Sequence, residues 1–306
     1  VAPATANIIA KMANGIADDL ISTTLLATPR PVVIAPAMNN GMWKAPATQA
    51  NMATLRDRGV HVVGPGSGYL ACGDVDTGRM SEPEDIVEAV SEVLNPAPQD
   101  LAGKRIVITA GPTHEPIDPV RFIGNRSSGK MGIALAGEAA RRGAAVTLVL
   151  GPTSLDVPHG VDCVRVQTAA EMLQAALNAF QTADAAICAA AVADYTPAAP
   201  ADHKLKKANE RLDRIELVET VDILAELSHQ KGERCVIGFA AETDNVVEYA
   251  ERKLVRKGCD AIVANDVSRA DSGFGTDTNK AWIVSTTGAQ ELPVLTKPQL
   301  ADTILD

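Results

Sequence analysis

Aromatic residues are scarce in this chain of 306 residues, since Phe, Tyr and Trp together make up only 3% of it. The hydrophobic core must therefore be built mainly from Ala, Val, Ile and Leu. The sequence also lacks any apolar run of the ~20 residues that a membrane-spanning helix needs. Its formal net charge is −10, whereas nonspecific nucleic-acid binding relies on positive charges that neutralise phosphates. We expect a globular protein that binds neither membranes nor nucleic acids.

Paired cysteines are missing as well. No C-x-x-C pair and no His-rich partner segment accompanies the five cysteines, which are Cys72, Cys163, Cys188, Cys235 and Cys259. Neither a zinc site nor a disulfide framework is indicated, and a reducing cytoplasm is the expected compartment. No secretory signal peptide is recognisable. Because the sequence starts at Val1 without an initiator Met, we expect a fragment of a longer chain.

The two common nucleotide-binding fingerprints are incomplete. The dinucleotide motif G-x-G-x-x-G does not follow the first predicted strand of the second half, which disfavours a nicotinamide cofactor. The run 124–131, GNRSSGKM, is close to the phosphate-loop motif of nucleotide hydrolases. However, Met131 has no hydroxyl for magnesium, and the run follows a long loop instead of a strand. An NAD(P)-dependent reductase on a Rossmann sheet is kept as an alternative that neither motif supports.

A βαβ unit is nevertheless predicted early in the second half. Residues 105–109 are apolar and β-rich enough for a buried strand, and a loop rich in charge and proline follows it. An amphipathic helix is expected over 130–143 and a second strand over 145–150. The free N–H groups at the helix start would favour a phosphate. The alternative is that Ser127 or Ser128 merely caps this helix.

A short Pro-rich segment at 95–100 separates two α/β halves, so we predict domains at 1–98 and 99–306. In the first half, helices are predicted at 5–13, 18–27, 46–58 and 84–94, and strands at 31–35 and 60–63. In the second half, further helices are predicted at 169–181, 245–257, 297–305 and from 220 onward. Further strands are predicted at 183–190, 214–218, 235–239 and 260–264, with a terminal hairpin of 281–285 and 291–294.

Five stretches of the second half resemble the phosphopantothenate–cysteine ligases: GPTHEPIDPVRFIGNRSSGKMG, AAAVADY, KLKK, GFAAET and ANDVS. In bacteria this ligase is usually fused behind a flavin-dependent phosphopantothenoylcysteine decarboxylase, which makes a two-step enzyme of coenzyme A synthesis. The first half is similar to the later portion of that decarboxylase, through PATAN at 3–7, PAMNNGMW at 36–43 and the glycine-rich loop around Cys72. The resemblance implies a partial flavodoxin-like flavoprotein domain followed by a Rossmann-like, parallel-sheet ligase domain.

For the ligase half, the resemblance implies attack of the 4′-phosphopantothenate carboxylate on CTP, release of pyrophosphate, and attack of the cysteine amine on the acyl-cytidylate with release of CMP. Asn125 would contact the acyl group, Arg121 would help to hold substrate or cysteine, and Lys204 would stabilise the intermediate. Asp194 would also face the Mg²⁺ that accompanies the triphosphate. The implied nucleotide-binding residues are Cys188, Ala189, Ala190, Asp194, Lys204, Val221, Asp222, Ile223, Leu224, Phe239, Lys253 and Lys257.

The residues themselves leave plainer interpretations open. Asp194 would suit a turn, and Phe239 would suit the core as well as a nucleobase. Lys253 and Lys257 share one helix face, which can be solvated or can hold a triphosphate. Val221 stands where relatives often carry Pro, so we expect it at the first helical position.

For the decarboxylase half, the resemblance implies FMN, which oxidises the substrate thiol so that carbon dioxide leaves readily. Asn39 would hold the substrate carboxylate, although it could equally cap a helix. Cys72 would return a proton to the product, since a thiol near its free pKa can donate one; the alternative is a small buried residue. The family's opening strands, with the FMN phosphate site and a catalytic His, have no counterpart here, so we expect this half to be truncated.

The expected partners are small molecules and further copies of the same chain. The resemblance implies dimers for the ligase half and trimers for an intact decarboxylase half. If the first half cannot complete a flavin site, it would serve in assembly only, which is a non-enzymatic alternative for this part of the chain.

Overall fold

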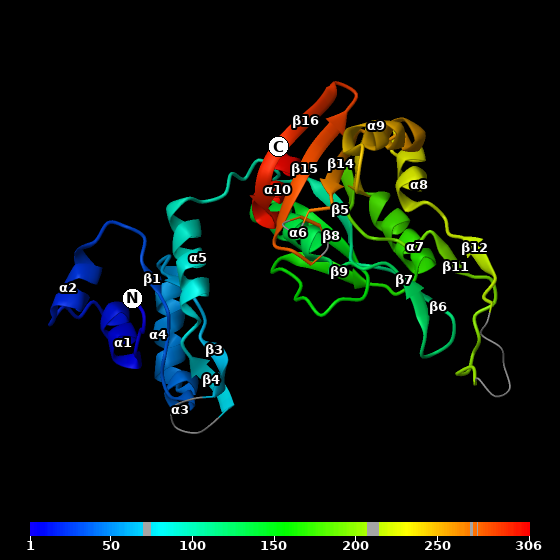
Figure 1. The fold of residues 1–306 in the computed structure, drawn as a ribbon. Helices are drawn as coiled ribbons and strands as arrows, with labels where there is room; N and C mark the ends of the chain where they lie inside the picture. The colour runs from blue at the N-terminus through cyan, green and yellow to red at the C-terminus, as the bar shows by residue number, and fades with distance from the viewer. Residues whose placement is uncertain (70–74, 207–213, 270–271, 274) are drawn as a thin grey trace. The chain divides into compact units, whose positions relative to one another are not determined.

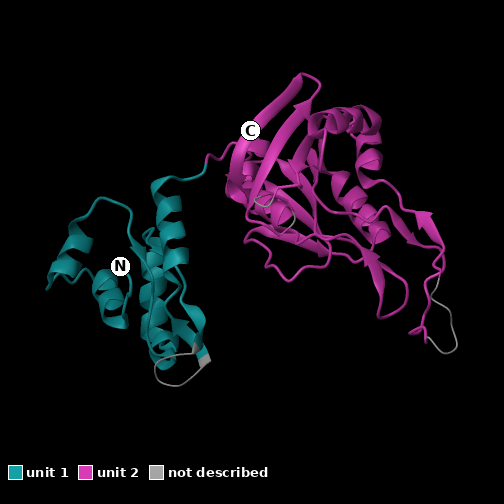
Figure 2. Ribbon diagram, in the orientation of Figure 1, with its two compact units in different colours: residues 1–97 teal, residues 98–306 magenta. Residues whose placement is uncertain are grey.

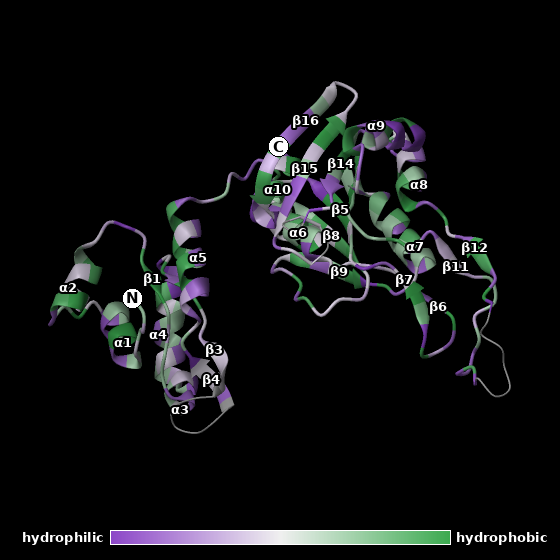
Figure 3. Cartoon of the chain, in the orientation of Figure 1, coloured by the Kyte–Doolittle hydropathy of each residue, from purple (hydrophilic) through white to green (hydrophobic). Residues whose placement is uncertain are grey.

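The computed structural model describes residues 1–69, 75–206, 214–269, 272–273 and 275–306. The chain divides into two compact units, Val1–Ala97 and Pro98–Asp306 (Figures 1 and 2). Among the described residues, one buried apolar cluster lies in the first unit and two lie in the second. Colouring by hydropathy shows polar residues along α9 and, on β16, both polar and hydrophobic residues (Figure 3).

The first unit is helical around two short pairs of strands. Its helices are α1 (Ala6–Asn14), α2 (Leu20–Ala27), α3 (Asn40–Lys44), α4 (Pro46–Asp57) and α5 (Pro83–Leu94). The strands β1 (Val33–Ile34) and β2 (His61–Val62) pair in parallel, and β3 (Gly66–Tyr69) and β4 (Val75–Arg79) pair antiparallel. Thr5 caps α1 by accepting from the Ile8 N–H, and Gly15 ends it in the left-handed conformation.

The second unit is built on an eight-stranded sheet in the order β16-β15-β14-β13-β10-β5-β8-β9. Six strands from β14 to β9 are mutually parallel, and the terminal hairpin is antiparallel. The strands are β5 (Arg105–Ala110), β8 (Ala145–Leu150), β9 (Val161–Arg165), β10 (Ala185–Cys188), β13 (Cys235–Glu242), β14 (Ala261–Asp266), β15 (Thr278–Ser285) and β16 (Gly288–Thr296). The predicted α/β class with a mostly parallel sheet is confirmed.

Helices cover both faces of this sheet. One apolar cluster joins the sheet to α7 (Ala169–Phe180), α8 (Ile223–His229) and α9 (Val246–Lys257), and the other joins it to α6 (Lys130–Arg141) and α10 (Lys297–Leu305). The predicted strand 105–109 illustrates why the central strands are apolar on both faces. Val107 belongs to the first cluster, whereas Ile106 and Ile108 belong to the second, so a strand that is buried on both faces reads as a continuous apolar run.

Strand order changes direction beside β5. From β5 the chain adds β8 and β9 on one side, and then β10, β13 and β14 on the other side. The carboxyl ends of β5 and β10 therefore border a topological switch point, where open α/β sheets bind their ligands.

Two small hairpins lie where the sequence predicted mainly loop. The first joins β6 (His114–Pro116) to β7 (Phe122–Gly124), and the second joins β11 (Tyr195–Pro197) to β12 (Leu217–Glu219). The strand predicted at 214–218 thus starts later than expected. Segments of three residues carry too little alternation to be recognised, and the pairing that defines β11 and β12 joins residues about 20 positions apart.

Candidate functional site

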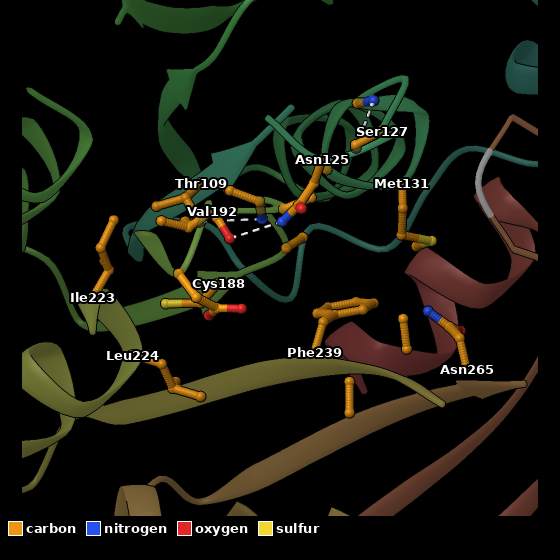
Figure 4. Close-up of a pocket in the computed structure, with 18 of the residues that line it drawn as sticks. Thr109, Asn125, Ser127, Met131, Cys188, Val192, Ile223, Leu224, Phe239 and Asn265 are labelled. Carbon is orange, nitrogen blue, oxygen red and sulfur yellow. Dashed lines mark hydrogen bonds between the residues drawn. The ribbon is translucent and has the colours of Figure 1, made fainter. Parts of the chain in front are cut away.

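A cleft of about 680 Å³ opens at the carboxyl edge of the second unit's parallel strands, which is a usual size for a small-molecule site. Its walls come from the ends of β5, β10, β13 and β14, the start of α6, the segment before α8, and α9 (Figure 4). Twelve of the residues named from the sequence line it: Asn125, Cys188, Ala189, Ala190, Asp194, Val221, Asp222, Ile223, Leu224, Phe239, Lys253 and Lys257.

The start of α6 forms one wall of the cleft. Gly129 is its N-cap residue, has φ +81°, and no described side chain caps the helix there. Ser127 and Ser128 instead accept hydrogen bonds from the N–H groups of Gly129 and Lys130, at 3.3 and 3.4 Å. Gly132 lets the helix approach β5, because an added Cβ would lie 2.3 Å from the Ala110 Cβ. The helix start thus presents its positive dipole end to the cleft.

Asn125 lies on the loop that leads into α6. Its Nδ2 donates a hydrogen bond of 2.9 Å to the backbone carbonyl of Val192, beyond the end of β10 (Figure 4). The amide thereby ties two loops that are 67 residues apart in the sequence, and its side chain remains exposed to the cleft.

Helix α9 supplies the positive charge at another wall. Lys253 Nζ donates to the Phe239 carbonyl at 2.7 Å, and burial lowers the pKa of Lys253 below that of an ordinary lysine. Lys257 forms an ion pair with Asp222, whose other carboxylate oxygen accepts from the Ala225 N–H at the start of α8. Both lysines line the cleft. The face of α9 that carries them therefore borders a cavity and does not face bulk solvent alone.

Val221 was predicted at the first position of α8, and this is wrong. The helix begins at Ile223 with Asp222 as its N-cap residue, so Val221 lies before the cap, and it is exposed. The reason is that the Asp222 carboxylate can accept from the backbone of the first turn, which is the preferred chemistry of an N-cap.

Asp194 and Cys188 both border the cleft. Asp194 is exposed, and among the described residues no group of three or more His, Cys, Asp or Glu side chains could hold a metal ion. Any Mg²⁺ at Asp194 would need ligands from a nucleotide, which is how Mg²⁺ is usually bound. Burial raises the pKa of the Cys188 thiol to about 12, which favours the neutral thiol over the thiolate in this wall of the cleft.

Arg121 and Lys204 are not among the residues that line the cleft. The Arg121 guanidinium donates to the buried carboxylate of Asp118 and, at 2.7 Å, to the backbone carbonyl of Leu205. The Leu205 N–H in turn donates to Asp118 at 3.2 Å. The neighbouring Lys204 is exposed, so this clamp fixes the chain beside Lys204.

In the first unit, Asn39 is the N-cap residue of α3 and accepts from the Gly41 N–H at 2.8 Å. Cys72 lies outside the described residues. The next residue, Asn40, donates to Asp76 on β4 at 2.6 Å. Among described residues, Asn40 Oδ1 is a buried side-chain oxygen without a hydrogen-bond partner. A ligand that donates an N–H or O–H would satisfy it, so the segment fits a bound cofactor or substrate.

Sequence reasoning missed several polar residues of the cleft, including Asn265, Arg256, Asn279 and Lys297. Lys130, in the run 124–131 that the sequence analysis singled out, also lines it. Asn265 could have been recognised, because it stands near the end of a predicted parallel strand, where ligands bind. Asn279 and Lys297 carry no such signal, since they belong to the terminal hairpin and the last helix.

Two family models match the chain. The DNA/pantothenate metabolism flavoprotein C-terminal domain matches residues 101–306, and the flavoprotein family matches residues 1–95. Within the described residues, none of the helices has the length and apolarity to cross a bilayer.

Curated relatives cover the whole chain. The coenzyme A biosynthesis bifunctional protein CoaBC of Bacillus subtilis (strain 168) is 50% identical over an alignment of 308 residues, which covers 100% of this chain and 76% of that protein. The protein of the same name from Escherichia coli (strain K12) is 50% identical over 309 residues, with the same coverage. A cysteine/cysteine sulfinic acid decarboxylase from an unknown prokaryotic organism is 46% identical over an alignment of 311 residues, which covers 100% of this chain and 86% of that protein.

Solved structures match the second unit. The C-terminal domain of a coenzyme A biosynthesis bifunctional protein CoaBC superposes with a TM-score of 0.57 at 47% identity, covering 67% of this chain and 93% of that one. A DNA/pantothenate metabolism flavoprotein from Streptococcus pneumoniae superposes with a TM-score of 0.58 at 24% identity, covering 66% and 97%, and shares the fold. By its family models and by its relatives, this chain belongs to the family of the coenzyme A biosynthesis bifunctional protein CoaBC.

Proposed function

We propose that the second unit joins the carboxylate of 4′-phosphopantothenate to the amine of L-cysteine at the expense of CTP, as one step of coenzyme A biosynthesis. The observation that supports this most is the cleft at the switch point, which combines a helix start suited to phosphate with Asn125, Asp194 and the lysines of α9. A carboxylate is a poor electrophile, so it must first be activated. Transfer to a nucleotide phosphate provides that activation.

In this proposal the substrate carboxylate attacks the α-phosphate of CTP, and the bond from that phosphate to pyrophosphate breaks. The acyl-cytidylate remains in the cleft until the cysteine amine attacks its acyl carbon, loses a proton, and expels CMP. The protein contributes mainly positioning and electrostatic stabilisation. Lys253 and Lys257 would hold the nucleotide from α9, together with Phe239, Asp194, the wall at 188–190 and the segment 221–224.

Asn125 would contact the acyl group from the loop before α6, in keeping with its exposure to the cleft. Lys204 would reach the intermediate from the neighbouring segment. Arg121 would support it through the clamp with Asp118 that holds Leu205. Mg²⁺ would bind the triphosphate and the Asp194 carboxylate.

For the first unit we propose that, in the full-length protein, it takes part in the FMN-dependent decarboxylation of the ligase product to 4′-phosphopantetheine. FMN, when bound, would supply the oxidation of the substrate thiol that makes loss of carbon dioxide easy. Asn39 would hold the substrate carboxylate, and Cys72 would return a proton. The flavoprotein match and the unsatisfied oxygen of Asn40 support this part.

We also propose that the chain forms homo-oligomers. The two small hairpins of the second unit expose a set of large apolar side chains: Phe122, Tyr195, Leu217 and Val218. Large apolar side chains that are exposed on short surface strands would suit a contact with another copy of the chain. In the first unit, α2 exposes Leu20, Ile21 and Leu26, which would suit a separate contact between copies. Light scattering on the purified protein would give the number of chains.

The decisive experiment is incubation with CTP, 4′-phosphopantothenate and L-cysteine while CMP and pyrophosphate are followed. With all three substrates present, we expect CMP and pyrophosphate to be released in equal amounts. Without L-cysteine, no CMP should be released. A thermal shift with NADPH but none with CTP would favour the reductase instead. Carbon dioxide release with added FMN tests the first unit, with free cysteine as a second substrate because one relative is a cysteine decarboxylase.

A further inference from the structure

Three polar side chains that line the cleft form a hydrogen-bonded row, and they come from three separate elements. Lys297 stands at the first position of α10, Asn279 on β15, and Asn265 near the end of β14. Lys297 is 6% exposed and Asn279 3% exposed. Lys297 Nζ donates to Asn279 Oδ1 at 2.5 Å, and Asn279 Nδ2 donates to Asn265 Oδ1 at 2.9 Å.

The chemistry of lysine sets the direction of this row. An ammonium group only donates hydrogen bonds, whereas an amide has one end that accepts and one that donates. Lys297 therefore holds the oxygen of Asn279 toward itself, which turns the nitrogen of Asn279 toward Asn265. The side-chain oxygen of Asn265 must therefore accept this hydrogen bond, which leaves the Asn265 side-chain nitrogen on the opposite side.

That free end of the row lies in the cleft. Asn265 lines the cavity, and Figure 4 shows its nitrogen turned toward Phe239 and Met131. In the part of the chain that the structure describes, this Nδ2 has no hydrogen-bond partner. A donor held in this way beside an aromatic ring is suited to a carbonyl, ribose or phosphate oxygen of a nucleotide.

We propose that Lys297 and Asn279 are positioning residues that fix the amide of Asn265 with its donor toward the bound nucleotide. The proposal rests on the proposed function for the identity of the ligand, but its geometry does not. Without the lysine, the two orientations of each amide would differ little in energy, because oxygen and nitrogen have nearly the same shape. The buried lysine thus determines that the cleft offers a donor instead of an acceptor at this point.

Asn279→Asp is the sharpest test, since it keeps the shape of the side chain. The carboxylate can still accept from Lys297, but it cannot donate to Asn265. Asn265 then turns its nitrogen toward Asp and its oxygen toward the nucleotide. We expect an unfolding temperature equal to or above that of the unmodified protein, because a buried lysine gains a counter-charge. We expect the Kd for CTP, measured by titration calorimetry, to rise by at least about tenfold.

Asn178→Asp is the matched control, because it makes the same change on the exposed face of α7 and should leave CTP binding unchanged. The path through Asn265 is tested by a double-mutant cycle. Asn265→Leu removes the donor, so adding Asn279→Asp to it should weaken binding no further. We call the row of Lys297, Asn279 and Asn265 the relay. The relay is wrong if the Asn279→Asp protein binds CTP with unaltered affinity, or if the losses of CTP affinity from the two substitutions add in the double variant.

A measurement without nucleotide separates this proposal from the proposed function. The side-chain NH₂ resonances of Asn265 can be assigned in NMR spectra by their loss in Asn265→Leu. We expect these protons to exchange with water quickly in the unmodified protein and to become protected in Asn279→Asp. If exchange is unchanged, the relay is wrong even though CTP binds. If exchange changes as expected but the unmodified protein ignores CTP, the relay holds and the proposed ligand is wrong.

Discussion

Lys253 on α9 donates a hydrogen bond of 2.7 Å to the backbone carbonyl of Phe239, the residue whose ring projects into the cleft. The lysine side chain is thereby held against β13, in a position where burial lowers its pKa. The same side chain therefore supports the wall of the cleft and supplies charge to it, and both contributions can be measured.

Replacement of Lys253 by Met should weaken the binding of CTP by about tenfold or more, since one charge-assisted contact is lost. In the unmodified protein, affinity should fall as pH rises through the lowered pKa of Lys253, because the ammonium loses its charge at a pH where a solvated lysine keeps it. The Met variant should lack this step. Calorimetric titrations at several pH values test this, with Lys104→Met, an exposed change, as the control. Equal pH profiles would contradict it.

The Asn125→Asp variant should release pyrophosphate while amide formation falls at least about a hundredfold, or it should stop the reaction altogether. A carboxylate cannot donate to the Val192 carbonyl as the amide does, and it would repel the negative charge that develops on the acyl group. The fold should be unaffected because the side chain is exposed. Rapid quenching followed by separation of the nucleotides would detect an accumulated acyl-cytidylate. Unchanged turnover to the amide would remove Asn125 from the mechanism.

Two glycines of α6 should respond in opposite ways to the same substitution. Gly132→Ala places a Cβ 2.3 Å from that of Ala110, so we expect a loss of about 1–3 kcal/mol in the free energy of unfolding and a displaced helix start with weaker nucleotide binding. Gly137→Ala meets only Pro158 at an ordinary 3.5 Å, and it should gain up to about 1 kcal/mol from helix propensity. Urea unfolding of both variants gives the comparison. A stable, fully binding Gly132→Ala protein would refute the close approach.

Lys297 should make stability depend on pH. Burial, and then the neighbouring charge of Lys130, lower its pKa from 10.5 to about 8. Between these values the unfolded chain binds more protons than the folded one, so the free energy of unfolding rises with pH over that range. Lys297→Met removes this contribution. The stability of the Met variant relative to the unmodified protein should therefore decline from pH 8 to 10.5, by at most about 3 kcal/mol. A difference that does not vary with pH would show that the folded lysine titrates normally.

Much of the fold could be predicted because it depends on local patterns. The strand at 145–150 and the helix at 297–305 were predicted with the bounds that the structure gives them. Both have clear signals, since β8 is a short run rich in β-branched residues and α10 begins with a Thr that caps it and a Pro in its first turn. The strands β6, β7 and β11 were missed and β12 was predicted with an earlier start, because these strands are defined by their partners and not by their own three residues.

The candidate site divides in the same way. Motifs along the chain indicated Asn125, Asp194, Phe239 and Lys253 as possible site residues, and the structure brings them to one cleft. Arg121 was expected to face substrate, but its guanidinium is engaged by Asp118 and by Leu205, a residue 84 positions away. No local pattern reports such a partner.

By itself the sequence determined the family, the alternation of strands and helices, and the chemical types of the residues near the strand ends, because these follow from composition, periodicity and motif. Only the tertiary structure decided which way the polar groups point. The amide of Asn265 is oriented by a lysine 32 positions further along the chain, through an asparagine on a third element. The direction of a hydrogen bond depends on which donor is next to which acceptor in space, and the order of residues does not contain that information.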